Sequence, residues 1–194
     1  DIGAQFGYFS LVAAQHAGPH GRVYAFEPAP ENLALLQRNV QLHGYGDVIR
    51  VVQKAVGDRP AVVTLFVYEG TDSHALYPPN GAVIRATVSV KCVTIDGFIG
   101  ERPVDVGKLD VEGHEPYALR GMERALASNN RLVLVTEFAP AYLRRGGTEP
   151  VAYLAQLGCL GFDVRVIDEQ ARCLRPAEPG FWPDDDPGWY TNLY

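Results

Sequence analysis

The chain has 194 residues, of which 47% are hydrophobic and 21% are charged, and its formal net charge is −6. These fractions are typical of a globular domain and exclude a disordered or collagen-like polymer. No apolar run approaches the ~20 residues that cross a bilayer, and no leader pattern opens the chain, so we predict no membrane association. The acidic balance also argues against nucleic acid as a partner.

The composition predicts one domain over residues 1–194, and three widely spaced cysteines without a C-x-x-C pair are compatible with a reducing cytoplasm. The chain opens on DIGAQFG at residues 1–7, a Gly-spaced turn of a kind that normally follows a buried strand. No strand residues precede this turn. We therefore expect the domain to lack part of its N-terminal region, including its first strand.

Apolar stretches of strand length alternate with amphipathic stretches of helix length, which predicts an α/β fold. Residues 7–17 are expected to form a helix that ends at the Gly-Pro-His-Gly sequence of residues 18–21. A strand over residues 23–26 follows, and then a helix that begins at Pro30, because proline suits a first helical turn. The apolar face of this helix comprises Leu33, Leu36 and Val40.

The middle of the chain is predicted to be rich in strands. Residues 48–56 and 62–68 are separated only by a short turn, so we expect them to form an antiparallel pair. Residues 69–86 are long enough to reach over a binding site, although a plain surface loop is the alternative. Alternating apolar and polar side chains predict a half-exposed strand over residues 87–93. A short buried strand over residues 106–111 ends in acidic residues.

The C-terminal part continues the alternation of helices and strands. Its tail, residues 176–194, either covers an acceptor pocket or is an acidic surface segment. The other predicted elements are a helix from Pro116 with an apolar stripe at Leu119, Met122 and Leu126, a strand over 131–138, a helix over 150–157 that Gly158 closes, and closing strands over 162–167 and 189–193.

Three groups of residues fall at the carboxyl ends of predicted strands, where open α/β sheets bind ligands. The first is the turn at residues 1–7, whose glycines allow close approach of a ligand and whose helix N-terminus offers free N–H groups. Its Gly-x-x-x-Gly spacing lacks the dinucleotide fingerprint, so a purely structural turn is the alternative. The second is Glu27, about 20 residues later, which could accept hydrogen bonds from both hydroxyls of a ribose or complement a helix dipole.

The third group is KLDVEGHE at residues 108–115. Three carboxylates and an imidazole crowd one strand end, which costs free energy unless they are hydrogen-bonded or meet a cationic ligand. A solvated surface cluster is the alternative. Asp110, Glu112 and His114 are also chemically suited to a divalent ion, but alternate residues of an extended segment point to opposite sides. We therefore predict no metal site.

Taken together, these residues resemble the FkbM family of S-adenosylmethionine-dependent methyltransferases over nearly the whole chain. One departure is Gln5-Phe6, which replaces a small polar pair often found inside the turn. The similarity is carried by DIGAQFGYFS at 1–10, VYAFEPAPENLALLQRN at 23–39, KAVGD at 54–58 and KLDVEGHE at 108–115, and more weakly by TDSHAL at 71–76, VTIDGF at 93–98 and the terminal Asn192-Leu193.

The resemblance implies a Rossmann-like class I methyltransferase fold, with a mostly parallel central sheet and antiparallel closing strands. It implies S-adenosyl-L-methionine as the cofactor, with the Gly turn at its methionyl end and Glu27 at its ribose. It also implies a small-molecule acceptor with a hydroxyl group, on a sugar or a polyketide-like compound. The cofactor-binding residues that it implies are Asp1, Gly3, Ala4, Gly7, Glu27, Pro28, Asn32 and Asp110.

For catalysis, our hypothesis makes Asp110 or His114 the general base, with Glu112 and Glu115 orienting the acceptor or the cationic cofactor. An imidazole titrates near neutrality, which favours His114, although this residue could instead be an ordinary loop residue. Two other functions compete. A nicotinamide-dependent oxidoreductase could use the same turn and acidic residue, and a binding module could keep the fold without catalysis.

Overall fold

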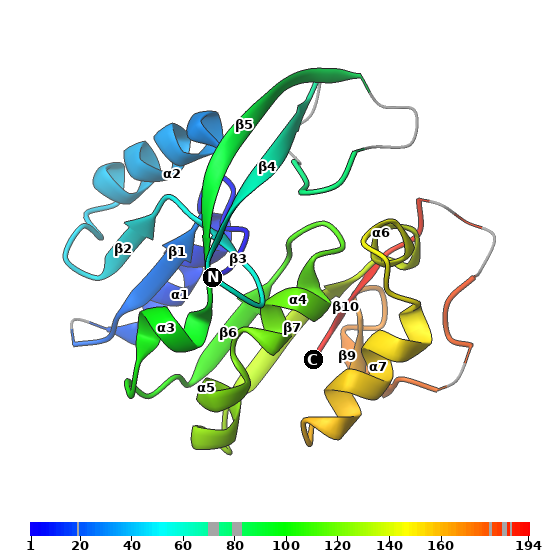
Figure 1. Cartoon of the computed structure of the whole chain (residues 1–194). Coiled ribbons are helices and arrows are strands. Elements are labelled where there is room, and N and C mark those ends of the chain that lie inside the picture. Colours follow the sequence, from blue (N-terminus) through cyan, green and yellow to red (C-terminus); the bar gives the residue numbers. More distant parts are fainter. Residues whose placement is uncertain (19, 70–73, 79–82, 179, 184–185, 187) are drawn as a thin grey trace.

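The computed structural model describes the whole chain except residues 19, 70–73, 79–82, 179, 184–185 and 187. It is a mixed α/β structure, as predicted (Figure 1). The strands are β1 (Val23–Phe26), β2 (Ile49–Val52), β3 (Ala55–Val56), β4 (Ala61–Tyr68), β5 (Ile84–Val93), β6 (Val106–Leu109), β7 (Val133–Phe138), β8 (Arg165–Asp168), β9 (Cys173–Pro176) and β10 (Thr191–Leu193). The helices are α1 (Tyr8–Ala17), α2 (Pro30–Leu42), α3 (Ile95–Ile99), α4 (Glu115–Arg120), α5 (Glu123–Ser128), α6 (Pro140–Arg145) and α7 (Pro150–Cys159).

Ile2 connects the two parts of the main sheet. It forms parallel bridges with Phe26 of β1 and Leu109 of β6, and its N–H donates to the carbonyl of Lys108 at 2.9 Å. The strand order is therefore β2-β1-Ile2-β6-β7-β10-β8-β9. Pairing is parallel from β2 to β7 and antiparallel from β7 to β9, as predicted for a mostly parallel sheet with antiparallel closing strands.

Helices cover both faces of this sheet, because successive side chains of a strand point to opposite sides. Val23 and Ala25 of β1 pack with Leu36 and Val40 of α2. Phe26, the next residue of the same strand, belongs instead to the larger core that α3, α4, α5 and α7 form on the other face. Strand β1 is thus buried on both sides, and the carboxyl ends of the parallel strands form one edge of the sheet.

The second sheet has the order β3-β5-β4, and Figure 1 shows β4 and β5 as a long ribbon that rises from the main sheet. It corrects two predictions. The expected strand over 48–56 is two strands in different sheets, because the N–H of Lys54 turns back to the carbonyl of Val52 at 2.9 Å. The expected antiparallel pair between this strand and β4 is also wrong, since β3 and β4 flank β5 on opposite sides.

Several helix boundaries also differ from the prediction. The helix expected from Pro116 is divided into α4 and α5 around Gly121 and Met122. The backbone of Gly57 approaches this break closely. A Cβ on Gly121 would lie 2.0 Å from the carbonyl oxygen of Gly57. Helix α7 runs one residue past Gly158. Helices α3 and α6 and strand β9 were not predicted, and β8 begins later than expected.

The C-terminal tail contributes to the core rather than forming only an acidic surface segment. The rings of Phe181, Trp182 and Trp189 pack against Phe138 with centroid separations of 5.3, 5.2 and 6.4 Å. Asp184 and Asp185, like Pro19 in the predicted helix stop, lie outside the described residues. The chain then returns through β10, which enters the main sheet between β7 and β8.

Candidate functional site

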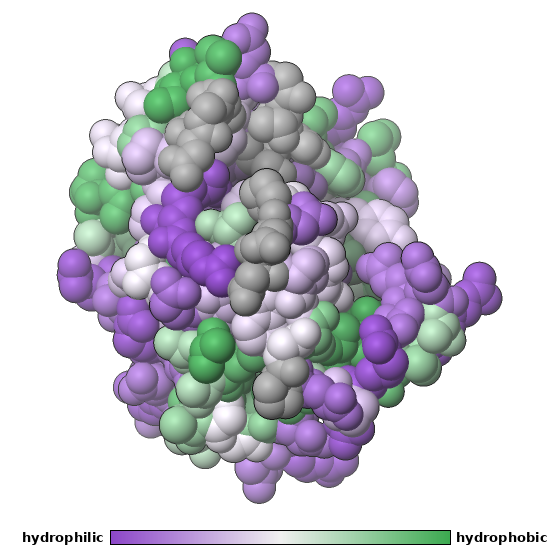
Figure 2. Space-filling model, turned by 90° about the vertical axis from the view of Figure 1, so that its right-hand side faces the viewer, coloured by the Kyte–Doolittle hydropathy of each residue, from purple (hydrophilic) through white to green (hydrophobic). Residues whose placement is uncertain are grey.

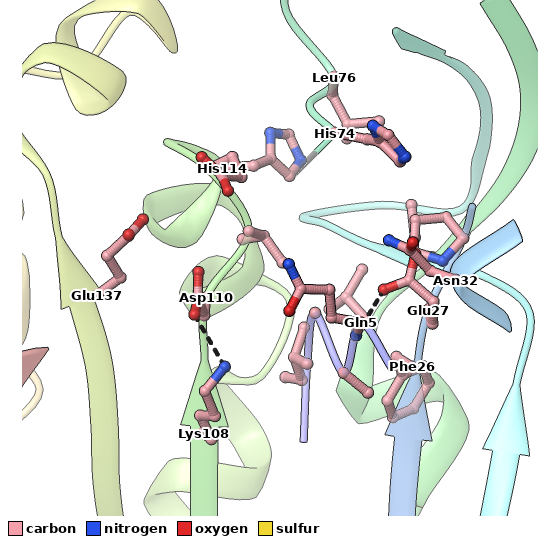
Figure 3. Close-up of a pocket in the computed structure, with 18 of the residues that line it drawn as sticks. Gln5, Phe26, Glu27, Asn32, His74, Leu76, Lys108, Asp110, His114 and Glu137 are labelled. Carbon is pink, nitrogen blue, oxygen red and sulfur yellow. Dashed lines mark hydrogen bonds and ion pairs between the residues drawn. The ribbon is translucent and has the colours of Figure 1, made fainter. Parts of the chain in front are cut away.

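A cavity of about 530 Å³ opens at the carboxyl ends of β1, β6 and β7. Figure 3 shows Glu137 and Asp110 on one side of it, Glu27 and Asn32 on the other, and Gln5 between them. Ligand pockets of small-molecule enzymes have volumes of roughly 300–1,000 Å³. The cavity is therefore of a size that holds a small ligand, at the place where ligands bind in open α/β sheets.

The turn at residues 1–7 has a backbone that requires glycine at two positions. Gly3 has φ +80°, and a Cβ there would lie 1.7 Å from the carbonyl oxygen of Asp110. Gly7 has φ +94°, and a Cβ there would lie 2.5 Å from Leu36. Gln5 also adopts a positive φ of 54°, which L residues adopt at a cost. The turn is thus fixed by close backbone packing against β6 and α2.

Glu27 ends β1 with its carboxylate buried and hydrogen-bonded. Its Oε2 accepts from the backbone N–H of Gln5 and its Oε1 from that of Ala29, each at 2.8 Å (Figure 3). The side chain of Asn32 also donates to it. Burial raises the pKa of Glu27 above its usual value, while these hydrogen bonds oppose the rise. A carboxylate has about four lone-pair sites, so these three bonds leave about one site for a further donor.

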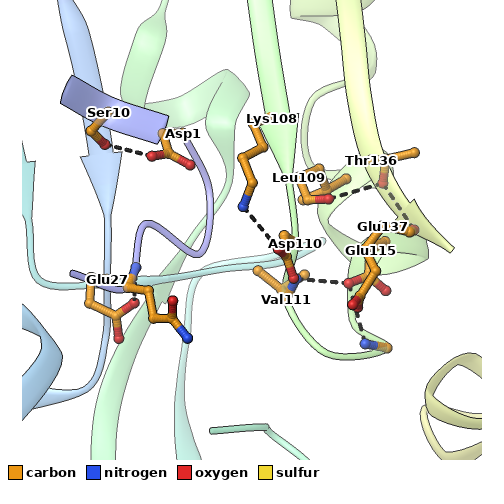
Figure 4. Close-up of polar contacts among 12 residues, drawn as sticks. Asp1, Ser10, Glu27, Lys108, Leu109, Asp110, Val111, Glu115, Thr136 and Glu137 are labelled. Carbon is orange, nitrogen blue, oxygen red and sulfur yellow. Dashed lines mark hydrogen bonds and ion pairs between the residues drawn. The ribbon is translucent and has the colours of Figure 1, made fainter. Parts of the chain in front are cut away.

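The predicted cofactor-binding residues divide into two groups. Gly3, Ala4, Glu27, Pro28, Asn32 and Asp110 all line the cavity. Asp1 and Gly7 do not line it and instead support the turn. The Oδ2 of Asp1 accepts a hydrogen bond from Ser10 in α1 at 2.5 Å, and Ser10 is fully buried (Figure 4).

The segment after β6 contributes the carboxylates that the sequence indicated. Asp110 forms an ion pair with Lys108, Nζ to Oδ2, at 2.9 Å, and Glu112 lines the cavity beside it. Glu115 is 1% exposed, and its Oε1 accepts from the N–H groups of Val111 at 2.8 Å and Gly113 at 3.3 Å (Figure 4). Glu115 therefore holds the loop in shape and does not line the cavity.

The pKa of Glu115 is raised to about 7, first by burial and then by the charge of Asp110. Hydrogen bonds from the loop backbone oppose this rise. Glu115 is thus a buried carboxyl whose protonation is sensitive to the charge of its neighbours.

Glu137 is a pocket residue that was not singled out from the sequence. It lies in β7, one residue past Thr136, which is in register with Leu109 of β6. Glu137 therefore occupies the strand-end position next to Asp110. Burial, followed by the charges of Asp110, Glu115 and Glu112, raises the pKa of Glu137 to about 10. The sequence signal that could have indicated it is the position of this acidic residue near the end of the predicted strand over 131–138.

His114 lies at the cavity wall with its ring engaged on two sides. Its Nδ1 is 2.6 Å from the hydroxyl of Tyr77, and its ring stacks on Tyr117 at a centroid distance of 4.6 Å. Burial lowers the pKa of His114 to about 4, so the imidazole is neutral at pH 7. Because Tyr77 belongs to the segment 69–86, this contact ties the described part of that segment to the site.

The segment 69–86 reaches the cavity, in agreement with one of the two readings that the sequence left open. His74 and Leu76 line it (Figure 3). Residues 71–73 of the weaker TDSHAL similarity lie outside the described residues. From the C-terminal tail, Tyr190 also lines the cavity.

The charges around the cavity favour a cation or a neutral ligand. Among the described lining residues, the ionisable acids are Glu27, Asp110, Glu112 and Glu137, and the lysines are Lys54 and Lys108. No group of three His, Cys, Asp or Glu side chains in the described part of the chain is arranged to hold a metal ion.

None of the helices in the described ranges has the length and apolar character needed to span a membrane. The face in Figure 2 carries several separate hydrophobic patches between hydrophilic residues.

Comparison with known proteins relates the chain to methyltransferases. The family model described as the methyltransferase FkbM domain matches residues 1–162. A crystal structure of the methyltransferase FkbM from Methylobacillus flagellatus KT matches the fold with a TM-score of 0.60 and 22% identity. The match covers 100% of this chain and 42% of that one.

Two curated proteins also match. "Methyltransferase 1" from Beauveria bassiana is 28% identical over 144 residues, which are 63% of this chain and 57% of that protein. A protein-L-isoaspartate O-methyltransferase from Aeropyrum pernix is 43% identical over 58 residues, 30% of this chain and 21% of that protein. The chain thus spans little more than half the length of the first relative and a smaller part of the second.

Proposed function

The chain belongs to the FkbM family of methyltransferases, and from this premise we propose that it transfers a methyl group from S-adenosylmethionine to a hydroxyl of a small molecule or saccharide. The observation that carries the proposal is that the Gly turn, Glu27 and Asp110 line the same cavity. A Rossmann-like class I fold is part of the same proposal, supported by the parallel strand order from β2 to β7.

The residues around the cavity fit this cofactor. Gly3 lets the backbone of the turn lie directly against Asp110, where a side chain would collide, and so brings the turn to the cavity wall. Glu27 keeps acceptor capacity for a hydroxyl of the ribose. Asp110 and Glu112 supply negative charge for a sulfonium. We propose that Gly3, Ala4, Glu27, Pro28, Asn32 and Asp110 contact the cofactor, with Asp1 and Gly7 supporting them.

The bound cofactor would supply an activated methyl group on a positively charged sulfur. The protein then has to align the acceptor oxygen with that methyl group and keep water out, and alignment of this kind can account for roughly 7–11 kcal/mol of a barrier. We assign the alignment to the Gly turn and Glu27 on one side and to the segment 110–115 on the other. The cavity would be shielded from water by the lining residues His74, Leu76 and Tyr190.

The acceptor is proposed to be neutral. Apart from Glu137, which is protonated at pH 7, three acids and two lysines line the described cavity, and Lys108 is already paired with Asp110. An anionic acceptor would meet like charge at the reacting end, which costs free energy in a partly buried site. A hydroxylated sugar or polyketide-like compound avoids this repulsion.

Calorimetric titration with S-adenosylhomocysteine and with NAD tests this function against a nicotinamide-dependent oxidoreductase. We expect S-adenosylhomocysteine to bind with one site per chain and NAD to bind at least about 100-fold more weakly, since the turn lacks the dinucleotide fingerprint. Binding of NAD alone would contradict the proposal. A methyl-transfer assay on a panel of hydroxylated acceptors then separates an enzyme from a binding module, because a module binds the nucleoside without consuming S-adenosylmethionine.

A further inference from the structure

Glu137 has a buried carboxylate oxygen without a partner, and this oxygen belongs to a residue that lines the cavity. Its Oε2 makes no hydrogen bond in the described part of the chain. Two other buried side-chain atoms share this property, one in Asp1 and one in Arg145, but neither residue lines the cavity. A buried polar atom without a partner is costly, so the unpaired oxygen of Glu137 indicates a bond that forms when a ligand is present.

The two residues that the sequence offered as general base are already engaged. Asp110 is paired with Lys108 at 2.9 Å. His114 is bonded to Tyr77 at 2.6 Å, and its pKa is lowered to about 4, which makes it a weak proton acceptor at pH 7. Glu137 therefore differs from both residues that the sequence offered as general base, since its Oε2 is buried and has no partner in the described part of the chain.

The surroundings of Glu137 favour its protonated form until a cation arrives. Burial and the charges of Asp110, Glu115 and Glu112 raise the pKa of Glu137 to about 10, so the carboxyl is neutral at pH 7 in the free protein. A positive charge bound in the cavity would oppose these neighbours and lower the proton affinity of Glu137. The carboxylate would then form while the cation is in place.

We propose that Glu137 is the catalytic base of the methyl transfer, and this inference rests on the function proposed above. The acceptor oxygen forms a bond to the methyl carbon, and the bond from that carbon to sulfur breaks with its electron pair left on sulfur. The proton of the acceptor hydroxyl passes to Oε2 of Glu137, remains there when the products depart, and leaves to solvent when the next cationic cofactor binds. The positive charge of the sulfonium and the negative charge of the carboxylate both disappear in this step.

Glu137→Gln keeps the shape of the side chain and removes the proton acceptor. We expect kcat to fall by at least about 100-fold, while the Kd for S-adenosylhomocysteine stays within about threefold of the wild type. The matched control is Glu101→Gln, which makes the same change at an exposed residue outside the cavity and is expected to leave kcat unchanged. A kcat for Glu137→Gln within threefold of the wild type would overturn the assignment.

Proton release on binding gives a second readout that does not depend on turnover. Calorimetry in two buffers of different ionisation enthalpy measures the protons released when S-adenosylmethionine, which is cationic at sulfur, or S-adenosylhomocysteine, which is not, binds to the chain. The wild type should release more protons with the cationic ligand, and Glu137→Gln should lose this difference. Equal proton release by the wild type with both ligands contradicts the inference.

A third variant separates loss of chemistry from loss of structure. Glu137→Asp keeps a carboxylate on a shorter side chain, so its kcat should exceed that of Glu137→Gln by about tenfold or more and should rise with pH. If both variants are folded and equally slow, Glu137 is not the base. Failure of the wild type to bind either nucleoside would instead contradict the proposed function itself.

Discussion

The two sides of the cavity satisfy their polar groups differently. On the Gly-turn side, formed by residues 1–7 with Glu27, both oxygens of the Glu27 carboxylate accept backbone N–H groups. On the carboxylate side, formed by Asp110, Glu112 and Glu137 with Glu115 behind them, one oxygen of Glu137 has no partner, and the proton affinity of Glu137 is raised by its neighbours. The Gly-turn side is therefore preformed for binding, whereas the carboxylate side depends on a ligand to complete it.

Gly3→Ala should disrupt the Gly-turn side and have the largest effect. A Cβ at this position would lie 1.7 Å from the carbonyl oxygen of Asp110, and the residue has φ +80°. We expect a loss of more than about 3 kcal/mol in the free energy of unfolding and no detectable binding of S-adenosylhomocysteine. Urea denaturation and calorimetry measure the two effects.

Gly46→Ala is the control for this change, because no atom lies within 4 Å of the added Cβ. Its stability and its binding should match the wild type. A Gly3→Ala protein that bound the nucleoside normally would mean that the turn is not the binding element.

The carboxylate side should give stability a pH dependence that Glu137→Gln removes. The folded protein keeps a proton on Glu137, whose pKa is raised to about 10, while the unfolded chain releases it near the ordinary value. The free energy of unfolding therefore falls as pH rises from about 5 towards 10, by up to about 1.4 kcal/mol per pH unit for one proton. Urea denaturation at pH 6 and pH 8 measures this slope in both proteins.

Glu115 contributes a fall of the same sign up to about pH 7, since its pKa is also raised, and this part remains in both proteins. The difference between the two slopes therefore belongs to Glu137. Identical slopes would show that Glu137 is ionised in the folded protein without a ligand.

Glu27→Gln should weaken the Gly-turn side by a smaller amount. An amide in place of the carboxylate leaves either the N–H of Gln5 or that of Ala29 facing another donor. We expect a loss of about 1–3 kcal/mol in stability and at least a tenfold weaker affinity for S-adenosylhomocysteine. Glu31→Gln, at an exposed ion pair with Arg85, should change neither by much. An unchanged affinity in Glu27→Gln would remove this residue from the ribose site.

Tyr77→Phe should have the smallest effect. It deletes the hydroxyl that contacts Nδ1 of His114 at 2.6 Å and so loosens the described part of the segment 69–86 from the site. We expect a loss of about 0.5–1.5 kcal/mol in stability, measured by thermal unfolding, with little change in the affinity for the nucleoside. A large drop in that affinity would mean that the segment is part of the cofactor site.

Elements defined by local signals could be predicted from the sequence. The strand over 23–26 has the predicted bounds, and the helix at Pro30 has proline in its first turn, because periodicity and proline act on nearby residues. The divisions at Lys54 and at Gly121 were missed because they depend on contacts with distant segments. The close approach of Gly57 to Gly121 is one such contact.

The candidate site was predictable to a similar extent. Glu27 and the segment 108–115 were found because acidic residues directly follow predicted strands. Glu137 was missed because its importance depends on the parallel register of β7 with β6, which brings it beside Asp110. The contact between His114 and Tyr77, 37 residues apart, likewise has no local signal.

A crystal structure of the chain with S-adenosylhomocysteine would test the division of the cavity most directly. We expect a ribose hydroxyl to bond to Glu27 and the sulfur to face the carboxylate side, with Asp110 and Glu137 nearest to the position of the missing methyl group. A nucleoside bound outside this cavity, or one whose sulfur faces away from Asp110 and Glu137, would contradict the proposed methyl-transfer site.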